Sequence, residues 1–238
     1  MKIELLFPEV ANLFGDSGNL KYLEKLFPKA EYIRSNLDSI PRFITHDDVD
    51  LIVLLAMSEK TQEKLIEKFK PYKYEIEAAI EAGKHFLFLG NSLEILGEYI
   101  ETDEGEKIAG LKIFPIYAKR QMMKRISSAF QGDKDGIKIY GIKAQFTQIY
   151  FIDSESEEKY SGFCSVEKGI GLNKDSDKEG LHYKNFIATN VIGPLLILNP
   201  KFTKIWAENL GRDPELELPY SEIIYKAYER REAYYENL

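Results

Sequence analysis

Few residues in this chain are suited to nucleophilic or acid–base chemistry. It contains one cysteine, Cys164, and three histidines, His46, His85 and His182. Cys164 lies in a strand-like, mainly apolar stretch, Phe163-Cys164-Ser165, and a single cysteine in that setting is typical of a small buried hydrophobe. We therefore do not expect the Cys164 thiol to act as a nucleophile.

The remaining polar motifs favour structural interpretations. Ser92 has no evident base, and capping of a helix explains it better. No set of His, Cys, Asp and Glu has the spacing of metal ligands. Gly15–Gly18 does not match a phosphate-binding Walker loop. Asp16, Ser17 and Asn19 precede a helical pattern and suggest a cap, although a helix N-terminus can also bind anions without specificity. The sequence predicts no metal and no cofactor.

Composition excludes several classes of function. The 238 residues are 44% hydrophobic and carry a net charge of −7, with a pI near 5.2. An acidic chain with interspersed charges lacks the basic footprint of a nucleic-acid-binding protein. One cysteine permits no intrachain disulfide, which fits a reducing compartment. We find neither a signal peptide nor a run of about 18 apolar residues, and we expect a cytoplasmic protein without membrane insertion.

The first half of the chain alternates predicted strands and helices. Continuous apolar runs indicate strands that are buried on both faces, and leucines at helical spacing indicate the helices between them. The predicted strands are 2–7, 31–33, 50–55 and 85–89. The predicted helices begin near residue 17, cover 61–69 and 75–80, and resume after a sharp turn at Gly90. This order predicts a parallel sheet with helices on both faces.

The second half has a different character. Strands predicted at 137–142 and 148–152 suggest a hairpin-rich, partly antiparallel region, with turn residues at 133–136. Residues 168–180 resemble a loop, 186–189 a short strand and 199–210 a helix. A final helix carries Ile223, Ile224, Ala227 and Tyr228 on one face. With no repeat or linker, we expect a single domain over residues 1–238.

Four segments occur in a distinctive order. They read LFPEVANLFGDSGN at 6–19, LFLGNSLEILGEY at 87–99, GIGLN with a later DKEG at 169–180, and GPLLILNP at 193–200. They resemble the GatD branch of the CobB/CobQ-like glutamine amidotransferases, whose patterns are roughly LYPD-x-x-NLYGD-x-GN, LAICGGYQLLGEY, GYGNN with a later EG, and HGPLLPKNP. The resemblance implies an α/β, three-layer, flavodoxin-like fold of the class I glutamine amidotransferases, with a mostly parallel central sheet and an antiparallel extension in the second half.

The resemblance also indicates what this chain lacks. A glutaminase of this class needs a thiolate at a strand-to-helix elbow and a histidine as its base. The position of the family cysteine is Gly90, and that of the family histidine is Ile192. Glycine has no reactive atom, and isoleucine can neither accept nor donate a proton. Loss of either partner typically costs about 10⁴–10⁶ in rate, so we expect no covalent chemistry here.

Other family site segments have also changed. The oxyanion loop, GGG in the family, aligns with Leu55, Ala56 and Met57, whose larger side chains restrict the approach. The family segment ENHxGRT aligns with residues 143–149 and has lost its glutamate, asparagine and histidine. By the resemblance, a family arginine that contacts substrate corresponds to Arg125, although a lone arginine is more often a surface residue.

The remaining polar residues of the opening motif, Asn12, Asp16 and Asn19, are candidates for ligand binding beside their interpretation as a cap. His182 lies in EGLHYKN, a string that members of the family can carry, so it need not be catalytic.

Three functions remain open. The first is a catalytically inactive amidotransferase-like subunit that acts as scaffold or regulator, with a Mur ligase-like, MurT-like partner in the lipid II amidation of peptidoglycan, as the resemblance implies. The second is an active subunit that supplies ammonia to such a synthetase. The third is a small-molecule binding module that reuses the old glutamine pocket. Tyrosines of the final helix could serve an interface, but packing onto their own domain is the simpler expectation.

Overall fold

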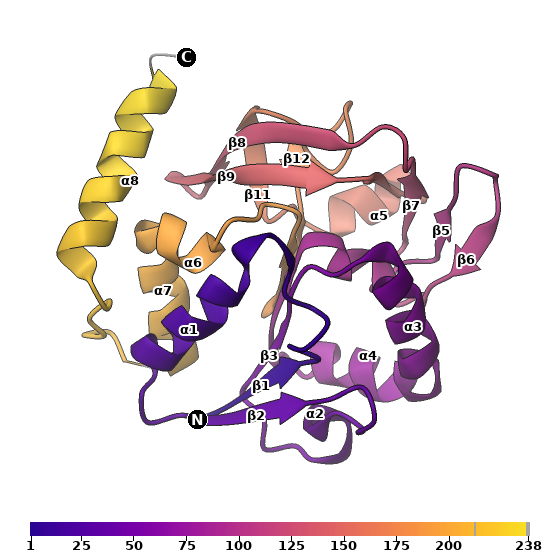
Figure 1. The fold of residues 1–238 in the computed structure, drawn as a ribbon, viewed down its shortest axis with the longest axis horizontal. Helices are drawn as coiled ribbons and strands as arrows, with labels where there is room; N and C mark the ends of the chain where they lie inside the picture. Colours follow the sequence, from indigo (N-terminus) through magenta and orange to yellow (C-terminus); the bar gives the residue numbers. More distant parts are fainter. Residues whose placement is uncertain (212, 237–238) are drawn as a thin grey trace.

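A six-stranded sheet forms the centre of the protein in the computed structural model, which describes residues 1–211 and 213–236 (Figure 1). Its strand order is β13-β14-β4-β3-β1-β2, and every neighbouring pair is parallel except β13–β14. The strands are β1 (Lys2–Leu6), β2 (Glu31–Ser35), β3 (Leu51–Leu54), β4 (His85–Leu89), β13 (Leu181–Tyr183) and β14 (Phe186–Thr189). The mostly parallel sheet is thus confirmed.

Helices cover both faces of this sheet, because the side chains of β3 and β4 are apolar in both directions. Ile52 and Phe88 belong to the core under α3 (Glu59–Phe69) and α4 (Lys73–Glu81). Val53 and Leu87 belong to the core under α1 (Ser17–Leu26) and α7 (Pro200–Gly211). Alternation of side chains along a strand sends successive residues to opposite faces, which produces the predicted three layers.

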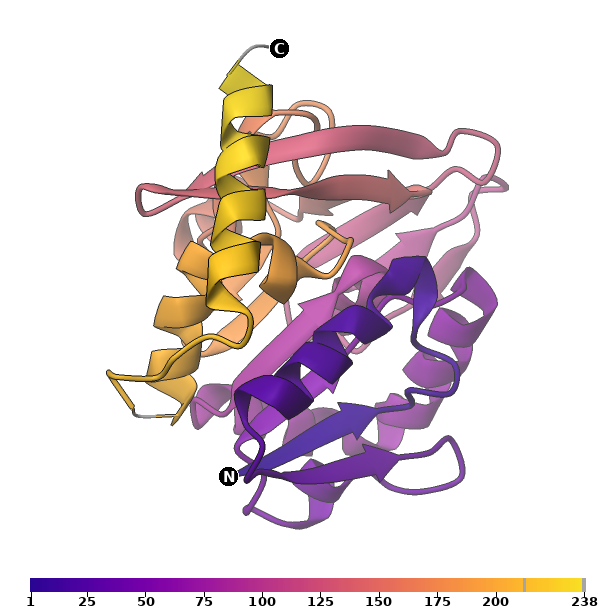
Figure 2. The same ribbon diagram turned by 60° about the vertical axis from the view of Figure 1, so that its left-hand side comes forward.

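The second half adds two smaller sheets, ordered β10-β7-β5-β6 and β12-β11-β8-β9, in which all pairs but β5–β7 are antiparallel. Their strands are β5 (Tyr99–Glu101), β6 (Lys107–Ala109), β7 (Ile116–Arg120), β8 (Ile126–Lys134), β9 (Ile137–Gln145), β10 (Thr147–Phe151), β11 (Cys164–Lys168) and β12 (Lys178–Glu179). Figure 2 shows the long β8–β9 hairpin lying across one end of the central sheet. The antiparallel extension is confirmed.

Shorter helical segments connect these layers. They are η1 (Leu13–Gly15), α2 (Arg42–Thr45), η2 (Lys70–Tyr72), η3 (Gly90–Leu96), α5 (Ser154–Lys159) and α6 (Leu195–Leu198). The segment after Gly90 is a 3₁₀ helix, tighter than the α-helix that the leucine spacing suggests. It ends at Gly97, where a β-carbon would lie 2.8 Å from the Ile116 carbonyl oxygen. The predicted loop at 168–180 also contains β12, which pairs with β11.

The last helix, α8 (Ser221–Glu236), packs along the side of the molecule (Figures 1 and 2). Tyr228 is fully buried and donates a hydrogen bond to the Lys138 carbonyl at 2.7 Å. The predicted apolar face is only half right, because Ile223 is 69% exposed while Ile224 is 6% exposed. Along the described residues, no helix combines the length and apolarity needed to cross a membrane.

Candidate functional site

A small cavity of about 100 Å³ lies at the carboxyl ends of the parallel strands, roofed by the turn between β9 and β10. Open α/β sheets bind their ligands at this edge. We refer to it as the carboxyl-end cavity, and it is lined by Leu13, Phe14, Met57, Ser58, Glu59, Gly90, Asn91, Ala144, Gln145, Phe146, Thr147, Asn190 and Ile192.

The two positions that align with the family cysteine and histidine meet at this cavity. Gly90 follows β4 directly and has φ +64°, a conformation that a strand-to-helix elbow imposes. Ile192 follows β14, is 1% exposed, and exchanges two backbone hydrogen bonds with Ile142 at 2.9 and 3.1 Å. The structure therefore brings together at one cavity two residues that are about a hundred positions apart in the chain.

Space at Gly90 is closed by the neighbouring loop. A β-carbon built on Gly90 would lie 2.5 Å from the Ala56 β-carbon and 3.0 Å from its α-carbon. Real β-carbons do not approach so closely, because close-packed interiors leave no room for such overlap. Glycine is thus required at this position by positive φ and by the Ala56 methyl group.

The loop that aligns with the family oxyanion loop is held by hydrogen bonds inside the protein. The Asn91 side-chain amide accepts from the Met57 N–H at 3.1 Å and donates to the Met57 carbonyl at 2.9 Å. The Ala56 carbonyl accepts from the Leu13 N–H at 3.1 Å. An oxyanion hole needs donors aimed at empty space, and the Met57 N–H is already engaged. Leu55, Ala56 and Met57 are buried, as expected.

Asp16 connects this loop to the segment after β14. Its buried Oδ1 accepts from the Gly193 N–H at 3.3 Å, and burial raises the pKa of Asp16 to about 7. Asn19 acts similarly, because its Oδ1 accepts from the Leu196 N–H at 3.0 Å. Asp16 makes no side-chain cap bond to α1, so the cap interpretation is wrong for this residue.

The other predicted site residues lie at the mouth or outside the cavity. The Arg125 guanidinium carbon is 5.6 Å from the ring centre of Phe14 and 5.8 Å from that of Phe146, two rings that line the cavity. Arg125 therefore lies over the mouth, where cation–π contacts hold it. Asn12 is exposed and donates to the Pro8 carbonyl at 2.8 Å.

Two polar residues that the sequence interpretation missed line the same cavity. Both side-chain atoms of Asn190, Nδ2 and Oδ1, are buried without a hydrogen-bond partner in the described structure, as is Oε1 of Gln145. Buried polar atoms are nearly always paired, so these three form an unsatisfied polar wall. Asn190 follows directly after β14, and a polar residue at the carboxyl end of a strand was the signal that could have revealed it.

Behind the wall lies a buried network around Glu94, the residue in place of the glutamine of the family's CGGYQ. Its carboxylate accepts from Gln62 Nε2 at 2.8 Å and from the Thr147 hydroxyl. Gln62 Oε1 in turn accepts from the Arg120 guanidinium at 2.7 Å. Burial raises the pKa of Glu94 to about 7. The network connects η3, α3, β7 and β10 and fixes the shape of the cavity.

A second buried ionic contact lies in the segment that aligns with ENHxGRT. Lys143 and Glu179 are both fully buried and form an ion pair. Lys143 Nζ also donates to the Gly171 carbonyl at 2.6 Å. Glu179 Oε1 accepts from Thr189 Oγ1 at 2.9 Å and from the Asn190 N–H at 2.7 Å. The pair is saturated with partners, which is what a buried ion pair requires.

Other potentially reactive groups lie elsewhere. Cys164 is buried in β11, and burial raises the pKa of its thiol far above the ordinary value, as expected of a structural cysteine. The Ser92 hydroxyl donates to the Leu89 carbonyl at 2.8 Å, so the capping interpretation is wrong for Ser92. Across residues 1–211 and 213–236, no cluster of three or more His, Cys, Asp and Glu could hold a metal ion.

Solved structures that share this fold include two described as glutamine amidotransferases. One described as glutamine amidotransferase matches with a TM-score of 0.55 and 10% identity, over 87% of this chain and 98% of the other. The PurLQS structure from Thermotoga maritima matches with a TM-score of 0.51 and 15% identity, over 90% of this chain and 96% of the other. At this identity, the likeness defines the class of fold: a class I amidotransferase-like α/β protein.

Sequence comparison assigns the chain to a narrower group of proteins than the fold does. The model of the CobB/CobQ-like glutamine amidotransferase domain matches residues 2–197, and the chain belongs to this family. It is similar to the GatD subunit of lipid II isoglutaminyl synthase (glutamine-hydrolyzing) from Staphylococcus aureus, 27% identical over 81% of this chain and 76% of the relative. The GatD subunit of the same enzyme from Streptococcus pneumoniae is 26% identical over 94% of this chain and 87% of the relative.

Proposed function

We propose that this chain is a GatD-like amidotransferase subunit that does not hydrolyse glutamine and serves as a scaffold or regulator in a complex. The observation that carries the proposal is the pairing of Gly90 with Ala56. The elbow position has no nucleophile, and the Ala56 methyl group fills the space in which a β-carbon would lie. Ile192 at the position of the family base supplies no proton acceptor.

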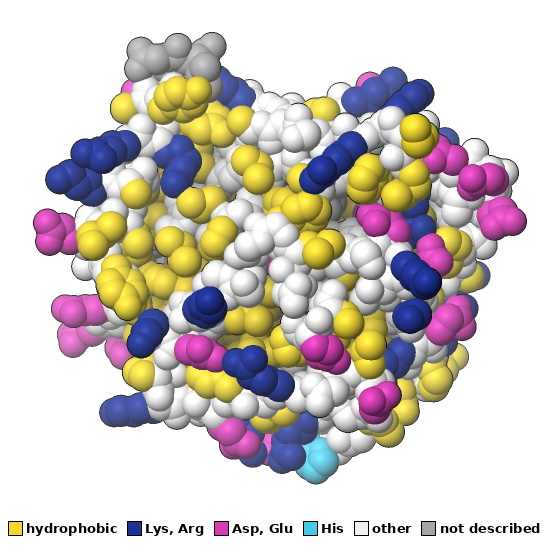
Figure 3. All heavy atoms as spheres, in the orientation of Figure 1, with side chains coloured by type: hydrophobic (Ala, Val, Ile, Leu, Met, Phe, Trp, Pro, Cys, Tyr) yellow, Lys and Arg dark blue, Asp and Glu magenta, His cyan; other side chains and the backbone are white. Residues whose placement is uncertain are grey.

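The partner that we propose is a Mur ligase-like synthetase. The named relatives are subunits of lipid II isoglutaminyl synthase, which supports a role in a complex that acts on peptidoglycan precursors. Figure 3 shows hydrophobic side chains gathered on the face near α8 and α1, at the left of the view. On α8 and just before it, Ile223 and Tyr220 are 69% and 61% exposed. Exposed apolar side chains of this kind are enriched at interfaces.

Glutamine hydrolysis provides the direct test. Ammonia release from glutamine should stay at background for the purified chain, alone and with a Mur ligase-like protein from the same organism. Activity in either sample would overturn the proposal and favour an active subunit. Co-purification of that protein with the wild-type chain, lost in Ile223→Glu but kept in Tyr74→Glu, would support the scaffold role. Tyr74 is 78% exposed on α4 and provides the matched control.

Restoring the lost groups tests the alignment itself. The restored variant needs three changes, Ala56→Gly, Gly90→Cys and Ile192→His, because a side chain at position 90 cannot fit beside Ala56. Gain of glutamine hydrolysis, absent from a control with Gly90→Ala in place of Gly90→Cys, would support the assignment of these positions. A folded variant that forms no covalent adduct with a glutamine-analogue alkylating agent would count against it.

A second candidate function is a non-catalytic binding module for a small amide. The unpaired atoms of Asn190 and Gln145 favour it, because together they offer a donor and two acceptors to a ligand in the carboxyl-end cavity. Titration calorimetry with glutamine and acetamide tests this function. Heat of binding in the wild type that disappears in Asn190→Leu would support it, and no heat with an intact partner complex would favour the scaffold.

A further inference from the structure

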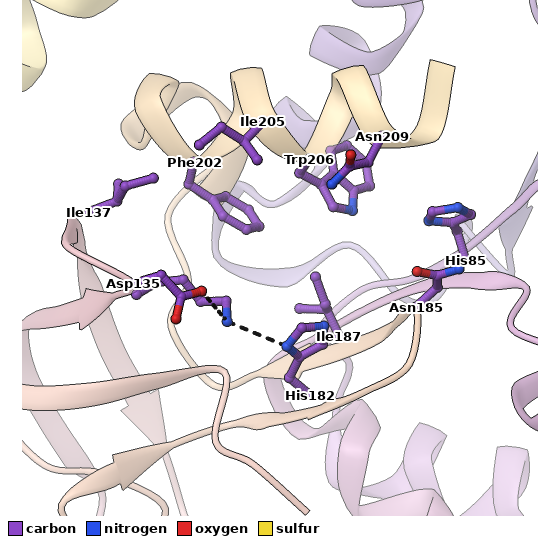
Figure 4. A pocket seen from close by; sticks show the side chains of 11 residues that line it. His85, Asp135, Ile137, His182, Asn185, Ile187, Phe202, Ile205, Trp206 and Asn209 are labelled. Carbon is purple, nitrogen blue, oxygen red and sulfur yellow. Dashed lines mark hydrogen bonds and ion pairs between the residues drawn. The ribbon is translucent and has the colours of Figure 1, made fainter. Parts of the chain in front are cut away.

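A second cavity lies at the opposite end of the central sheet, where β4 begins. Its volume is about 260 Å³, and it is enclosed by α7, the β8–β9 turn and the β13–β14 hairpin (Figure 4). We refer to it as the amino-end cavity. It shares no residue with the carboxyl-end cavity, so the amidotransferase-like site does not account for it.

The walls of the amino-end cavity are largely apolar. Phe202 and Trp206 project from α7, and Ile187 faces them from β14 (Figure 4). Phe202 is 5% exposed and Ile187 is 6% exposed, so these side chains form a rigid lining. The volume lies just below the roughly 300–1,000 Å³ of sites for drug-sized ligands. An occupant of this size has one ring and few other atoms.

One donor in this lining has no acceptor in the protein. Trp206 is 6% exposed, and its indole Nε1 is buried without a hydrogen-bond partner among the described residues. Figure 4 shows the indole nitrogen facing the space between α7 and the β13–β14 hairpin. An indole N–H can only donate, and leaving it buried and unpaired costs about 1–3 kcal/mol. The cavity therefore offers a site for a hydrogen-bond acceptor.

A cation lies at the other side of the same cavity. The Lys134 side chain is 17% exposed, and its ammonium is 3.1 Å from Asp135 Oδ2, on a side chain that is 85% exposed. Lys134 Nζ also lies 3.4 Å from His182 Nδ1. Burial and the Lys134 charge lower the pKa of His182, which keeps this ring neutral near pH 7. Lys134 is thus a partly buried cation whose one ion-pair partner among the described residues is a solvated carboxylate that a ligand can replace.

We propose that the amino-end cavity binds a small aromatic monocarboxylate, with its carboxylate on Lys134 and its ring between Phe202 and Ile187, where the π face of the ring is the acceptor for the indole N–H of Trp206. A cation at one side, an N–H donor at the other and apolar walls between them together select this chemistry. A neutral amide loses the charge attraction to Lys134, and an amine is repelled by it.

Trp206 is the only tryptophan of the chain, so its fluorescence reports directly on occupancy. Phenylacetate is the probe, with phenylacetamide and phenethylamine as neutral and cationic analogues of the same shape. We expect saturable quenching by phenylacetate with a Kd of about 0.1–1 mM, the range open to a ligand of this size. The amide should bind about tenfold more weakly, and the amine should not bind.

Substitutions separate the two donors. Lys134→Met should raise the Kd for phenylacetate about tenfold or more, the weight of a charge-assisted hydrogen bond. Trp206→Phe, followed by calorimetry, should raise it about two- to threefold, the contribution of a weak N–H···π contact. Lys184→Met is the matched control, because Lys184 is a surface lysine in the turn of the β13–β14 hairpin that does not line the cavity. It should leave the Kd unchanged.

Three results would overturn the proposal. One is the absence of any saturable response of Trp206 up to about 10 mM phenylacetate, well above the expected Kd. Another is equal affinity for the acid, the amide and the amine. The third is unchanged binding in a folded Lys134→Met protein, with folding verified by its unfolding midpoint. Glutamine hydrolysis has no part in this test, so its outcome is independent of the proposed function.

Discussion

The Ala56 methyl group occupies the space that a β-carbon on Gly90 would need, at a distance of 2.5 Å. We predict that Gly90→Ala destabilises the protein by about 2–4 kcal/mol, because overlap in a packed site adds to the cost of positive φ. Gly15→Ala is the matched control, since Gly15 has φ +76° and nothing within 4 Å of a built β-carbon. It should cost only about 1 kcal/mol.

Removing the overlap should recover part of that loss. Ala56→Gly with Gly90→Ala removes the 2.5 Å overlap and leaves the backbone strain and the 3.0 Å approach to the α-carbon of residue 56. Chemical denaturation should therefore place the double variant about 1–2 kcal/mol above Gly90→Ala alone. Equal stability of Gly90→Ala and Gly15→Ala would contradict the steric account.

Glu94 should make stability depend on pH. Burial raises its pKa from 4.5 to about 7 in the folded protein, so the folded state holds a proton that the unfolded chain has released. Between about pH 4.5 and 7 this group therefore lowers the free energy of unfolding as pH rises. Glu94→Gln cannot titrate, and its stability relative to wild type should rise across that window by about 1–3 kcal/mol. A constant difference from pH 4 to 8 would contradict this prediction.

Removing one partner of the buried Lys143–Glu179 pair should lower the free energy of unfolding more than replacing both partners. Lys143→Met leaves the Glu179 carboxylate buried without its cation, and we expect a loss of about 3–5 kcal/mol. Glu179→Gln combined with Lys143→Met should lose less than Lys143→Met alone. Urea unfolding of the two single variants and the double variant gives the coupling energy, and additive losses would show that the pair is not coupled.

Cys164 should report on unfolding. It is 4% exposed and burial raises the pKa of its thiol, so native protein should react with an aromatic disulfide reagent at least about 10³ times more slowly than urea-unfolded protein. Fast modification of the native protein would show that the thiol is accessible. Cys164→Ala should show no labelling and also provides the background for any thiol placed at position 90.

Much of the fold can be predicted from local sequence patterns. Buried strands such as β3 and β4 are predictable because they are apolar on both faces, and Gly90 marks a turn that the structure places at the elbow. Predictions failed where a side chain forms a distant contact instead of a local one. Asp16 looks like a cap in sequence, yet its carboxylate binds Gly193, which is 177 residues away. Asn190 was marked in sequence only by its position at the carboxyl end of a strand, and Trp206 was missed because its unpaired indole N–H is visible only after packing.

Strand β9 reaches both cavities, one at each of its ends. Ile137 at its start lines the amino-end cavity, and Gln145 at its end lines the carboxyl-end cavity, on the same face because they are eight positions apart. Midway between them, Gly141 leaves room for Val191, which a β-carbon would displace. A slip of one position would turn both lining residues outward. Because Gly141 has no β-carbon, β9 can pack against Val191 in the register that places Ile137 at one cavity and Gln145 at the other.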